Sequence, residues 1–168
     1  MFELPKKRHR YFLKAKEAKH LLSDISETFG AEIEHILASK TRVEVNETET
    51  AEIFIFDGTP LLARIDGILF PTLTFEEFFP LMSRLVVDMG AIPYVCKGAD
   101  VMAPGVVSIN GEFKESDILL ITDERHGKPL AIGLALFSSE DMKSVNRGKT
   151  VKTIHYVGDK LWKHLKGS

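Results

Sequence analysis

The sequence has little of what several common classes of site require. Its 168 residues include a single cysteine, Cys96, which excludes an internal disulfide framework and a zinc site built from cysteine pairs. No apolar run approaches the roughly 18 residues of a membrane-spanning helix. The N-terminus is basic but has no apolar segment behind it, so we expect no secretory signal. With 44% hydrophobic and 27% charged residues, the composition is that of a globular protein, which we expect in the cytoplasm.

The sequence patterns of common catalytic and cofactor sites are missing as well. No two of the six histidines stand at the i, i+4 spacing of a helical zinc site. Residues 146–150 read NRGKT, the last letters of a phosphate-binding loop, but the first glycine and the preceding strand of that motif are absent. No serine sits in a nucleophile elbow. We therefore predict a binding protein that is not an enzyme and that uses no metal ion and no cofactor.

Charged residues are abundant but unevenly distributed. The net charge is −2, yet residues 1–20 carry +5 and residues 138–168 carry +4, whereas residues 21–57 carry −7. Basic charge gathered at both ends of a chain is the electrostatic footprint of a polyanion ligand, with solvated charged termini as the alternative. The N-terminal basic patch consists of Lys6, Lys7, Arg8, Arg10 and Lys14.

Hydrophobic periodicity and turn signals predict two units and an α+β fold class. The first half combines an amphipathic helix, ending at Gly30, with an antiparallel meander of strands joined by tight Asp-Gly turns. The second half has short, regularly spaced strands and a closing helix, which is typical of a small β-barrel. We predict domains of residues 1–86 and 87–168. The predicted helices cover residues 16–29, 75–79, 138–145 and 159–165, and the predicted strands cover 11–13, 42–46, 51–56, 61–65, 68–70, 118–122, 130–136 and 150–157.

A stretch rich in glycine and proline, residues 87–107, organises the second half. The predicted order there is a strand over residues 94–97, a turn at Gly98, a helix over 99–102, a turn at Pro104-Gly105 and a strand over 106–109. Such an elbow leaves several backbone N–H groups without partners, and these groups suit phosphate oxygens or base edges. A plain barrel corner closed by glycines is the alternative. We expect Gly98 or Gly105 to adopt a conformation closed to other residues, or to lie close to a neighbouring strand.

Two long motifs resemble the ends of a known RNA-binding module. DMGAIPYVCKGADVMAPGVV, over residues 88–107, resembles the opening of a PUA domain, the module named after pseudouridine synthases and archaeosine transglycosylases. VNRGKTVKTIHYVGDKLW, over residues 145–162, resembles its close. Together with the N-terminal half, which would be the pre-PUA domain, the whole chain is similar to the malignant-T-cell-amplified-sequence family of translation proteins and their archaeal relatives.

The resemblance implies an RNA-binding site in which two segments of the chain lie side by side. The elbow would supply backbone that a ligand approaches closely, and the segment around Gly148 would supply cations for phosphates. Asp100 departs from a pure phosphate clamp, because its carboxylate repels phosphate, and favours recognition of shape or base edges. The residues expected to bind RNA are Lys97, Gly98, Ala99, Met102, Pro104, Gly105, Arg147, Lys149 and Lys152.

The resemblance also implies partners. Members of this family associate with the small ribosomal subunit and, with a density-regulated-protein partner, handle tRNA during initiation or recycling. The PUA half would face tRNA or rRNA, and the N-terminal half, with its basic patch, would contact the ribosome and such a partner. Two other functions stay open. In one, the barrel is a scaffold and the acidic segment 21–57 docks a protein; in the other, the chain is a recognition subunit for an RNA-modifying enzyme.

Overall fold

The computed structural model describes residues 9–40 and 42–167, which form two compact units that divide between Phe75 and Glu76. Each unit combines a β-sheet with helices, which confirms the predicted α+β class. Within the described ranges, no helix is both long enough and apolar enough to cross a membrane.

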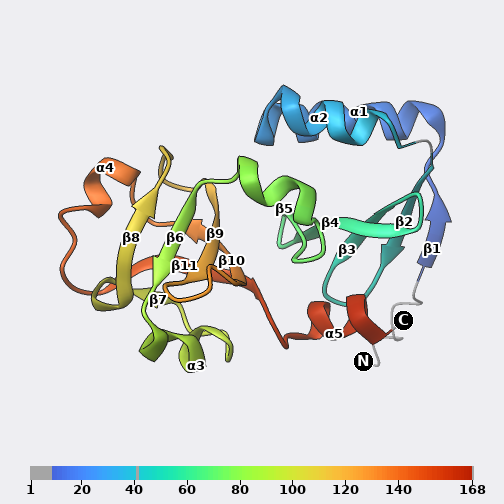
Figure 1. The fold of residues 1–168 in the computed structure, drawn as a ribbon. Coiled ribbons are helices and arrows are strands. Elements are labelled where there is room, and N and C mark those ends of the chain that lie inside the picture. The colour runs from blue at the N-terminus through green and yellow to red at the C-terminus, as the bar shows by residue number, and fades with distance from the viewer. Residues whose placement is uncertain (1–8, 41, 168) are drawn as a thin grey trace, which may run out of the picture. The chain divides into compact units, whose positions relative to one another are not determined.

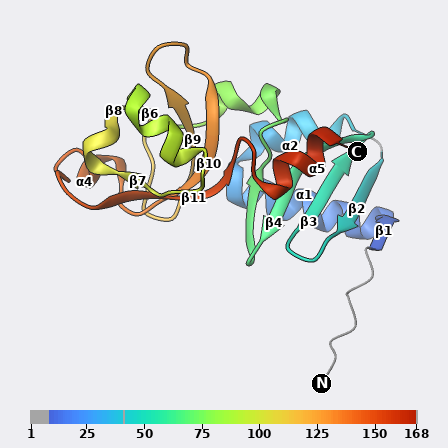
Figure 2. The same cartoon turned by 90° about the horizontal axis from the view of Figure 1, so that it is seen from below.

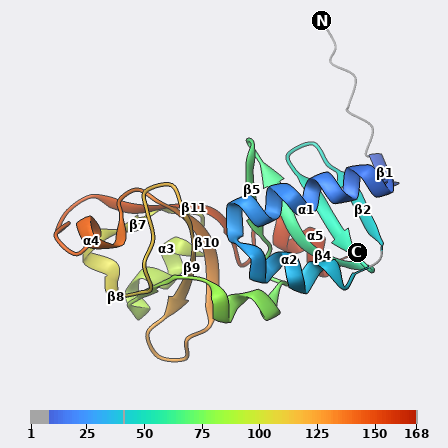
Figure 3. The same cartoon turned by 90° about the horizontal axis from the view of Figure 1, so that it is seen from above.

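The first unit is a five-stranded antiparallel sheet whose strands follow one another in chain order from β1 to β5. Helices α1 and α2 lie together on one face of this sheet (Figure 1), and views from below and above show them behind and in front of the strands (Figures 2 and 3). Its elements are β1 (His9–Phe12), α1 (Ala15–Phe29), α2 (Ala31–Ala38), β2 (Val43–Glu47), β3 (Glu52–Phe56), β4 (Thr59–Ile65) and β5 (Ile68–Pro71).

Local signals in the sequence account for this unit. The predicted helix ends at Gly30, whose φ of +95° breaks it and whose N–H donates to Ser26 O at 2.8 Å. Each Asp-Gly pair has positive φ at both residues, as the tightest hairpin turns require. Ile25 of α1 and Ile33 of α2 are fully buried, so the apolar stripe of the predicted helix forms core. Helix α2 was not among the predicted helices.

The second unit is a curled six-stranded sheet in the order β7-β11-β10-β9-β6-β8. All its pairings are antiparallel except that of β6 with β9. Its elements are the 3₁₀ helix η1 (Glu76–Leu81), β6 (Arg84–Val87), η2 (Met89–Ala91), α3 (Ile92–Val95), β7 (Val101–Met102), η3 (Ala103–Gly105), β8 (Val106–Asn110), β9 (Ile118–Asp123), β10 (Pro129–Ala135), α4 (Ser139–Met142), β11 (Lys149–Tyr156) and α5 (Lys160–Gly167).

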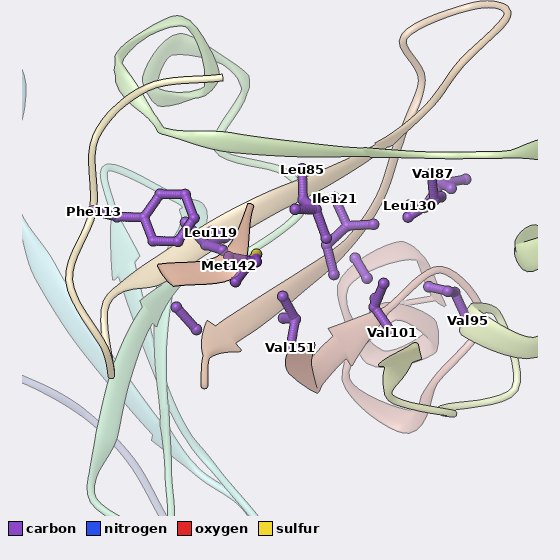
Figure 4. Close-up of a cluster of buried hydrophobic side chains, with 12 residues drawn as sticks. Leu85, Val87, Val95, Val101, Phe113, Leu119, Ile121, Leu130, Met142 and Val151 are labelled. Atoms are coloured by element: carbon purple, nitrogen blue, oxygen red, sulfur yellow. The ribbon is translucent and has the colours of Figure 1, made fainter. Parts of the chain in front are cut away.

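Strand β6 lies across the predicted domain boundary between residues 86 and 87. It pairs antiparallel with β8 and parallel with β9, so all four of its residues belong to the sheet of the second unit. Leu85 of β6 is fully buried with Leu119 and Ile121 of β9 and Val151 of β11 in one apolar cluster (Figure 4). The second unit therefore begins before β6.

The helix predicted after Thr74 forms only as the 3₁₀ helix η1. The Thr74 hydroxyl does not cap it, because it donates to Pro60 O at 2.6 Å and lies 2.7 Å from the Thr72 hydroxyl. Pro80 lies inside the element, where it removes a backbone donor.

The prediction for residues 94–102 was wrong in type at two places. Residues 92–95 form helix α3 instead of a strand over 94–97, because Asp88 accepts a hydrogen bond from Ala91 N at 2.8 Å and Pro93 occupies the first turn of α3. Residues 101 and 102 form strand β7 instead of a helix over 99–102, because Val101 is buried opposite Val151 of β11. The turns at Gly98 and at Pro104-Gly105, and the strand that follows, are confirmed.

Gly98 ends α3 in a left-handed conformation with φ of +92°. Its N–H donates to Val95 O and the Ala99 N–H donates to Tyr94 O, both at 3.0 Å, which is the pair of bonds of a Schellman motif. A Cβ atom on Gly98 would lie 2.9 Å from Cε1 of Tyr156. Gly98 thus meets both expectations, whereas Gly105 has no positive φ and its Cβ would meet only the Ala91 side chain, at 3.3 Å.

Asp159 fixes the connection between β11 and α5. Its two carboxylate oxygens accept hydrogen bonds from Tyr156 N at 3.0 Å and Trp162 N at 2.6 Å, and Oδ2 lies 2.9 Å from Nδ1 of the fully buried His155. Burial alone would raise the pKa of Asp159, but the hydrogen bond and charge of His155 and the two N–H donors outweigh burial and lower it. This turn carries Tyr156, whose ring packs against Gly98.

The place of β6 predicts which fragment folds alone. Residues 76–168 should give a cooperative thermal transition, because they contain the whole second sheet. Residues 88–168 should not, because without β6 nothing joins β8 to β9. Circular dichroism melts of the two fragments check this, and a cooperative transition in the shorter one would contradict it.

Gly98→Ala should lower the free energy of unfolding by about 1–3 kcal/mol, because alanine is strained at positive φ and its Cβ meets Tyr156. Gly148→Ala is the matched control, since Gly148 has φ of +82° but no atom within 4 Å of a built Cβ. Urea denaturation should therefore show a larger loss for Gly98→Ala. Equal losses of unfolding free energy in the two variants would mean that the Tyr156 ring moves aside at no energetic cost.

The lowered pKa of Asp159 predicts a stability that depends on pH. The unfolded chain binds the proton more tightly, so Asp159 stabilises the protein above its ordinary pKa of 3.8, and this contribution is lost as the pH falls through the folded-state value. Asp159→Asn should lower Tm at neutral pH, and the gap from wild type should close between about pH 5 and about pH 2. A gap that stays constant over that range would show that the charge of Asp159 contributes nothing.

Candidate nucleic-acid interface

A cleft of about 700 Å³ opens in the second unit beside α3, β7 and η3. We call it the elbow cleft. Among its lining residues, those predicted from the sequence are Gly98, Ala99, Met102, Pro104, Gly105 and Lys149. Those not predicted are Asp88, Gly90, Ala91, Tyr94, Val95, Asp100 and Val101. Two segments about fifty residues apart thus meet in one hollow, because β7 pairs with β11 in a register that sets Met102 opposite Lys149.

Exposed apolar side chains form part of the cleft. Tyr94, on the outer side of α3, is 68% exposed, and Met102 on β7 is 46% exposed. A single exposed apolar side chain is ordinary, but these two line the same cleft, and apolar surface gathered in one place marks interaction sites. Sequence reasoning missed Tyr94 because it placed this residue in a strand; the signal that was available is Asp88 with Pro93, a cap and an N-terminal proline that indicate a helix.

Asp100 ties the elbow to β11. Its Oδ1 accepts a hydrogen bond from Thr153 N at 3.0 Å, and its Oδ2 lies 3.1 Å from Nζ of Lys149. The Thr153 hydroxyl donates to Ala99 O at 2.9 Å, so the same two segments are joined twice. The Asp100 side chain nevertheless keeps 23% of its surface exposed.

The cleft itself does not favour a phosphate. Its charged residues are Asp88 and Asp100 against Lys149, and the Lys149 ammonium is already paired with a carboxylate. Two carboxylates around one paired cation repel a dianionic or monoanionic group. The cleft therefore suits an uncharged, flat group that can lie against Tyr94 and Met102.

The other predicted cations lie outside the lining. Lys97 follows α3, Arg147 precedes β11 and Lys152 lies on β11, all of them exposed. No ion pair involves any of these three side chains within residues 9–40 and 42–167. We call Lys97, Arg147 and Lys152 the outer cations; their charges are available to a ligand that extends beyond the cleft.

The N-terminal basic patch is described only in part. Arg10 on β1 is bound by both its Nε and a terminal nitrogen to the carboxylate of Glu44, so its charge is already matched. That hydrogen bond is the main reason why the pKa of Glu44 lies below its ordinary value. Lys14 is exposed, and Lys6, Lys7 and Arg8 lie outside the described residues.

The first unit has a hollow of its own, of about 640 Å³, between α1 and the sheet. Leu21 of α1, Val45 of β2 and Phe54 of β3 supply apolar surface there, and side chains of both signs surround it. Arg64 stands 5.3 Å over the Phe54 ring and 3.7 Å from the carboxylate of Glu52, so this edge of the hollow is occupied by its own side chains.

The remaining titratable side chains include possible metal ligands and one thiol. In the part of the chain that the structure describes, no three histidine, cysteine, aspartate or glutamate residues are grouped so as to hold a metal ion. Cys96 is half-buried at the end of α3, and burial raises the pKa of its thiol, which keeps it protonated and unreactive.

Comparison with protein families divides the chain as the two units do. Residues 83–157 match the model of the PUA domain, and residues 9–75 match a domain of unknown function, DUF1947. These matches confirm the resemblance of the second half to a PUA domain.

Curated relatives match across most of the chain. It is 39% identical over 156 residues to an uncharacterized protein of Methanocaldococcus jannaschii, and the match covers 92% of this chain and 96% of the relative. It is 33% identical over 138 residues to Translation machinery-associated protein 20 of Eremothecium gossypii, covering 77% and 76%. It is 32% identical over 163 residues to human Malignant T-cell-amplified sequence 2, covering 92% and 90%.

Two solved structures share the fold over nearly their full length. A hypothetical protein of Pyrococcus horikoshii has a TM-score of 0.79 and 37% identity, covering 94% of this chain and 99% of that one. A PUA-domain structure from Aeropyrum pernix, solved with tartrate, has a TM-score of 0.79 and 27% identity, covering 95% and 92%. The chain therefore belongs to the family of Translation machinery-associated protein 20 and the Malignant T-cell-amplified sequence proteins, and its second unit is a PUA domain, an RNA-binding module.

Proposed function

We propose that this protein binds tRNA or ribosomal RNA through the elbow cleft and the outer cations, as part of translation initiation or recycling. The observation that carries the proposal is that exposed Tyr94 and Met102 line the cleft, while the exposed outer cations stand close in sequence to lining residues. Family membership supports the link to translation, because relatives are named for the translation machinery. The role we propose is binding without catalysis, in the cytoplasm.

The two parts of the interface divide the ligand between them. An unstacked base would lie against Tyr94 in the cleft, where the net charge is unfavourable for phosphate. The flanking phosphates would meet Lys97, Arg147 and Lys152 outside it. Lys149 stands at the border, since it lines the cleft and carries an exposed ammonium. This division explains why an acid occurs within a site for RNA.

For the first unit we propose contact with the small ribosomal subunit and with a density-regulated-protein-like partner. Supporting features are its own hollow between α1 and the sheet and the exposed ring of Phe12 at the end of β1. The adaptor function, with residues 21–57 as a protein-docking surface, needs no RNA affinity, so the experiment below separates it from this proposal.

Changing Arg147 and Lys149 together to glutamate should weaken the binding of a single-stranded RNA and flatten its salt dependence. Each lost phosphate contact should reduce the slope of log K against log salt by about 0.7. Tm should change little, because both side chains are exposed and the ion pair that Lys149 loses with Asp100 lies at the surface. Fluorescence anisotropy at several salt concentrations measures the slope.

The matched control changes Lys114 and Lys143 to glutamate. Both are exposed cations of the same unit, and both line a different hollow, beside α4. The control alters the net charge equally, so it should lower affinity less and leave the slope near the wild-type value. Equal effects of the two double variants would show that Arg147 and Lys149 contribute only general positive charge. A wild-type protein without RNA affinity would favour the adaptor function.

A further inference from the structure

We propose that Asp100 makes the elbow cleft selective for an unpaired nucleobase that carries an exocyclic amino group, and against uracil. The inference rests on the proposed RNA binding and goes beyond it, because it names the class of base and the residue that selects it. It follows from the position, the partners and the remaining hydrogen-bonding capacity of one carboxylate.

Asp100 is held in place from two sides. Thr153 N donates to Oδ1 at 3.0 Å, and the Lys149 ammonium lies 3.1 Å from Oδ2. These contacts fix the carboxylate plane, since one partner is backbone of β11 and the other a side chain of the same strand. A base in the cleft would therefore meet a carboxylate whose orientation is fixed.

The carboxylate has capacity left after these two contacts. An ionised aspartate accepts about four hydrogen bonds. The Asp100 side chain is 23% exposed, and Asp100 is one of the residues that line the cleft. Asp88 also lines the cleft and brings a second carboxylate to it. One of its oxygens, Oδ1, accepts the hydrogen bond from Ala91 N. The polar side chains facing a base are thus rich in acceptors, with Lys149 as the one charged donor.

A cleft lined by hydrogen-bond acceptors favours the bases that present hydrogen-bond donors to it. Cytosine and adenine present an amino group, and aspartate accepts from the N4 amino group of cytosine in known base contacts. Uracil has a carbonyl oxygen at the position where cytosine has its amino group, so this oxygen would face the Asp100 carboxylate instead of donating to it. Cytosine and uracil are the clean comparison, since the two pyrimidines are of equal size and differ chiefly in hydrogen bonding.

The test measures the affinity of the whole protein for short single-stranded oligocytidine and oligouridine of equal length, at neutral pH and fixed salt. We expect wild type to bind oligocytidine about tenfold more tightly or better, the range in which one good base contact discriminates. Equal affinity for the two oligomers would overturn the inference without any variant. Failure to bind either one would instead overturn the proposed RNA binding.

Two variants then assign the selectivity. Asp100→Asn keeps an oxygen for the Thr153 N–H but replaces the charged acceptor by an amide that also donates, so the preference for oligocytidine should fall toward one. Lys149→Gln removes the partner of Asp100 in the ion pair but leaves the Asp100 carboxylate. It should therefore lower the affinity for both oligomers and leave the preference for oligocytidine unchanged. Loss of the preference in Lys149→Gln, or its retention in Asp100→Asn, would overturn the assignment to Asp100.

Discussion

The second unit depends on one backbone constraint, the left-handed turn at Gly98. Its positive φ lets α3 end in a Schellman motif and sends the chain into β7 within three residues. The Tyr156 ring occupies the place where a side chain would be, so the turn and β11 fit only because Gly98 has none. Tyr94 before the turn, and Asp100 and Met102 after it, are brought to one cleft by this geometry.

Electrostatics divide the interface into two regions with different chemistry. Within the cleft, Asp100 and Asp88 outnumber Lys149, which is paired with Asp100. Outside it, Lys97, Arg147 and Lys152 stay exposed. A polyanion with unstacked bases fits this arrangement better than a plain anion does, since its bases and phosphates would occupy different regions. The net charge of −2 conceals this division, because it averages the basic ends with the acidic segment 21–57.

Sequence reasoning succeeded where structure is decided by neighbours in the chain. The Asp57-Gly58 turn, the end of α1 at Gly30 and the start of α4, where Ser138 accepts from Asp141 N at 3.1 Å, all follow from residues within one turn. It failed over residues 94–102 because a short apolar run reads equally as strand or helix. The residue that favours a helix here, Asp88, lies several residues before this run.

By itself the sequence determined the α+β class, the meander of the first unit and the succession of short strands in the second. These depend on periodicity and turn residues, which are local, whereas the two segments at the elbow cleft were expected from the resemblance to a PUA domain. The tertiary structure decided which cations are paired, since Lys149 and Asp100 are 49 positions apart in the chain. It also decided that Tyr94 is exposed and that β6 joins β8 to β9, because long-range pairing and packing set burial and strand order.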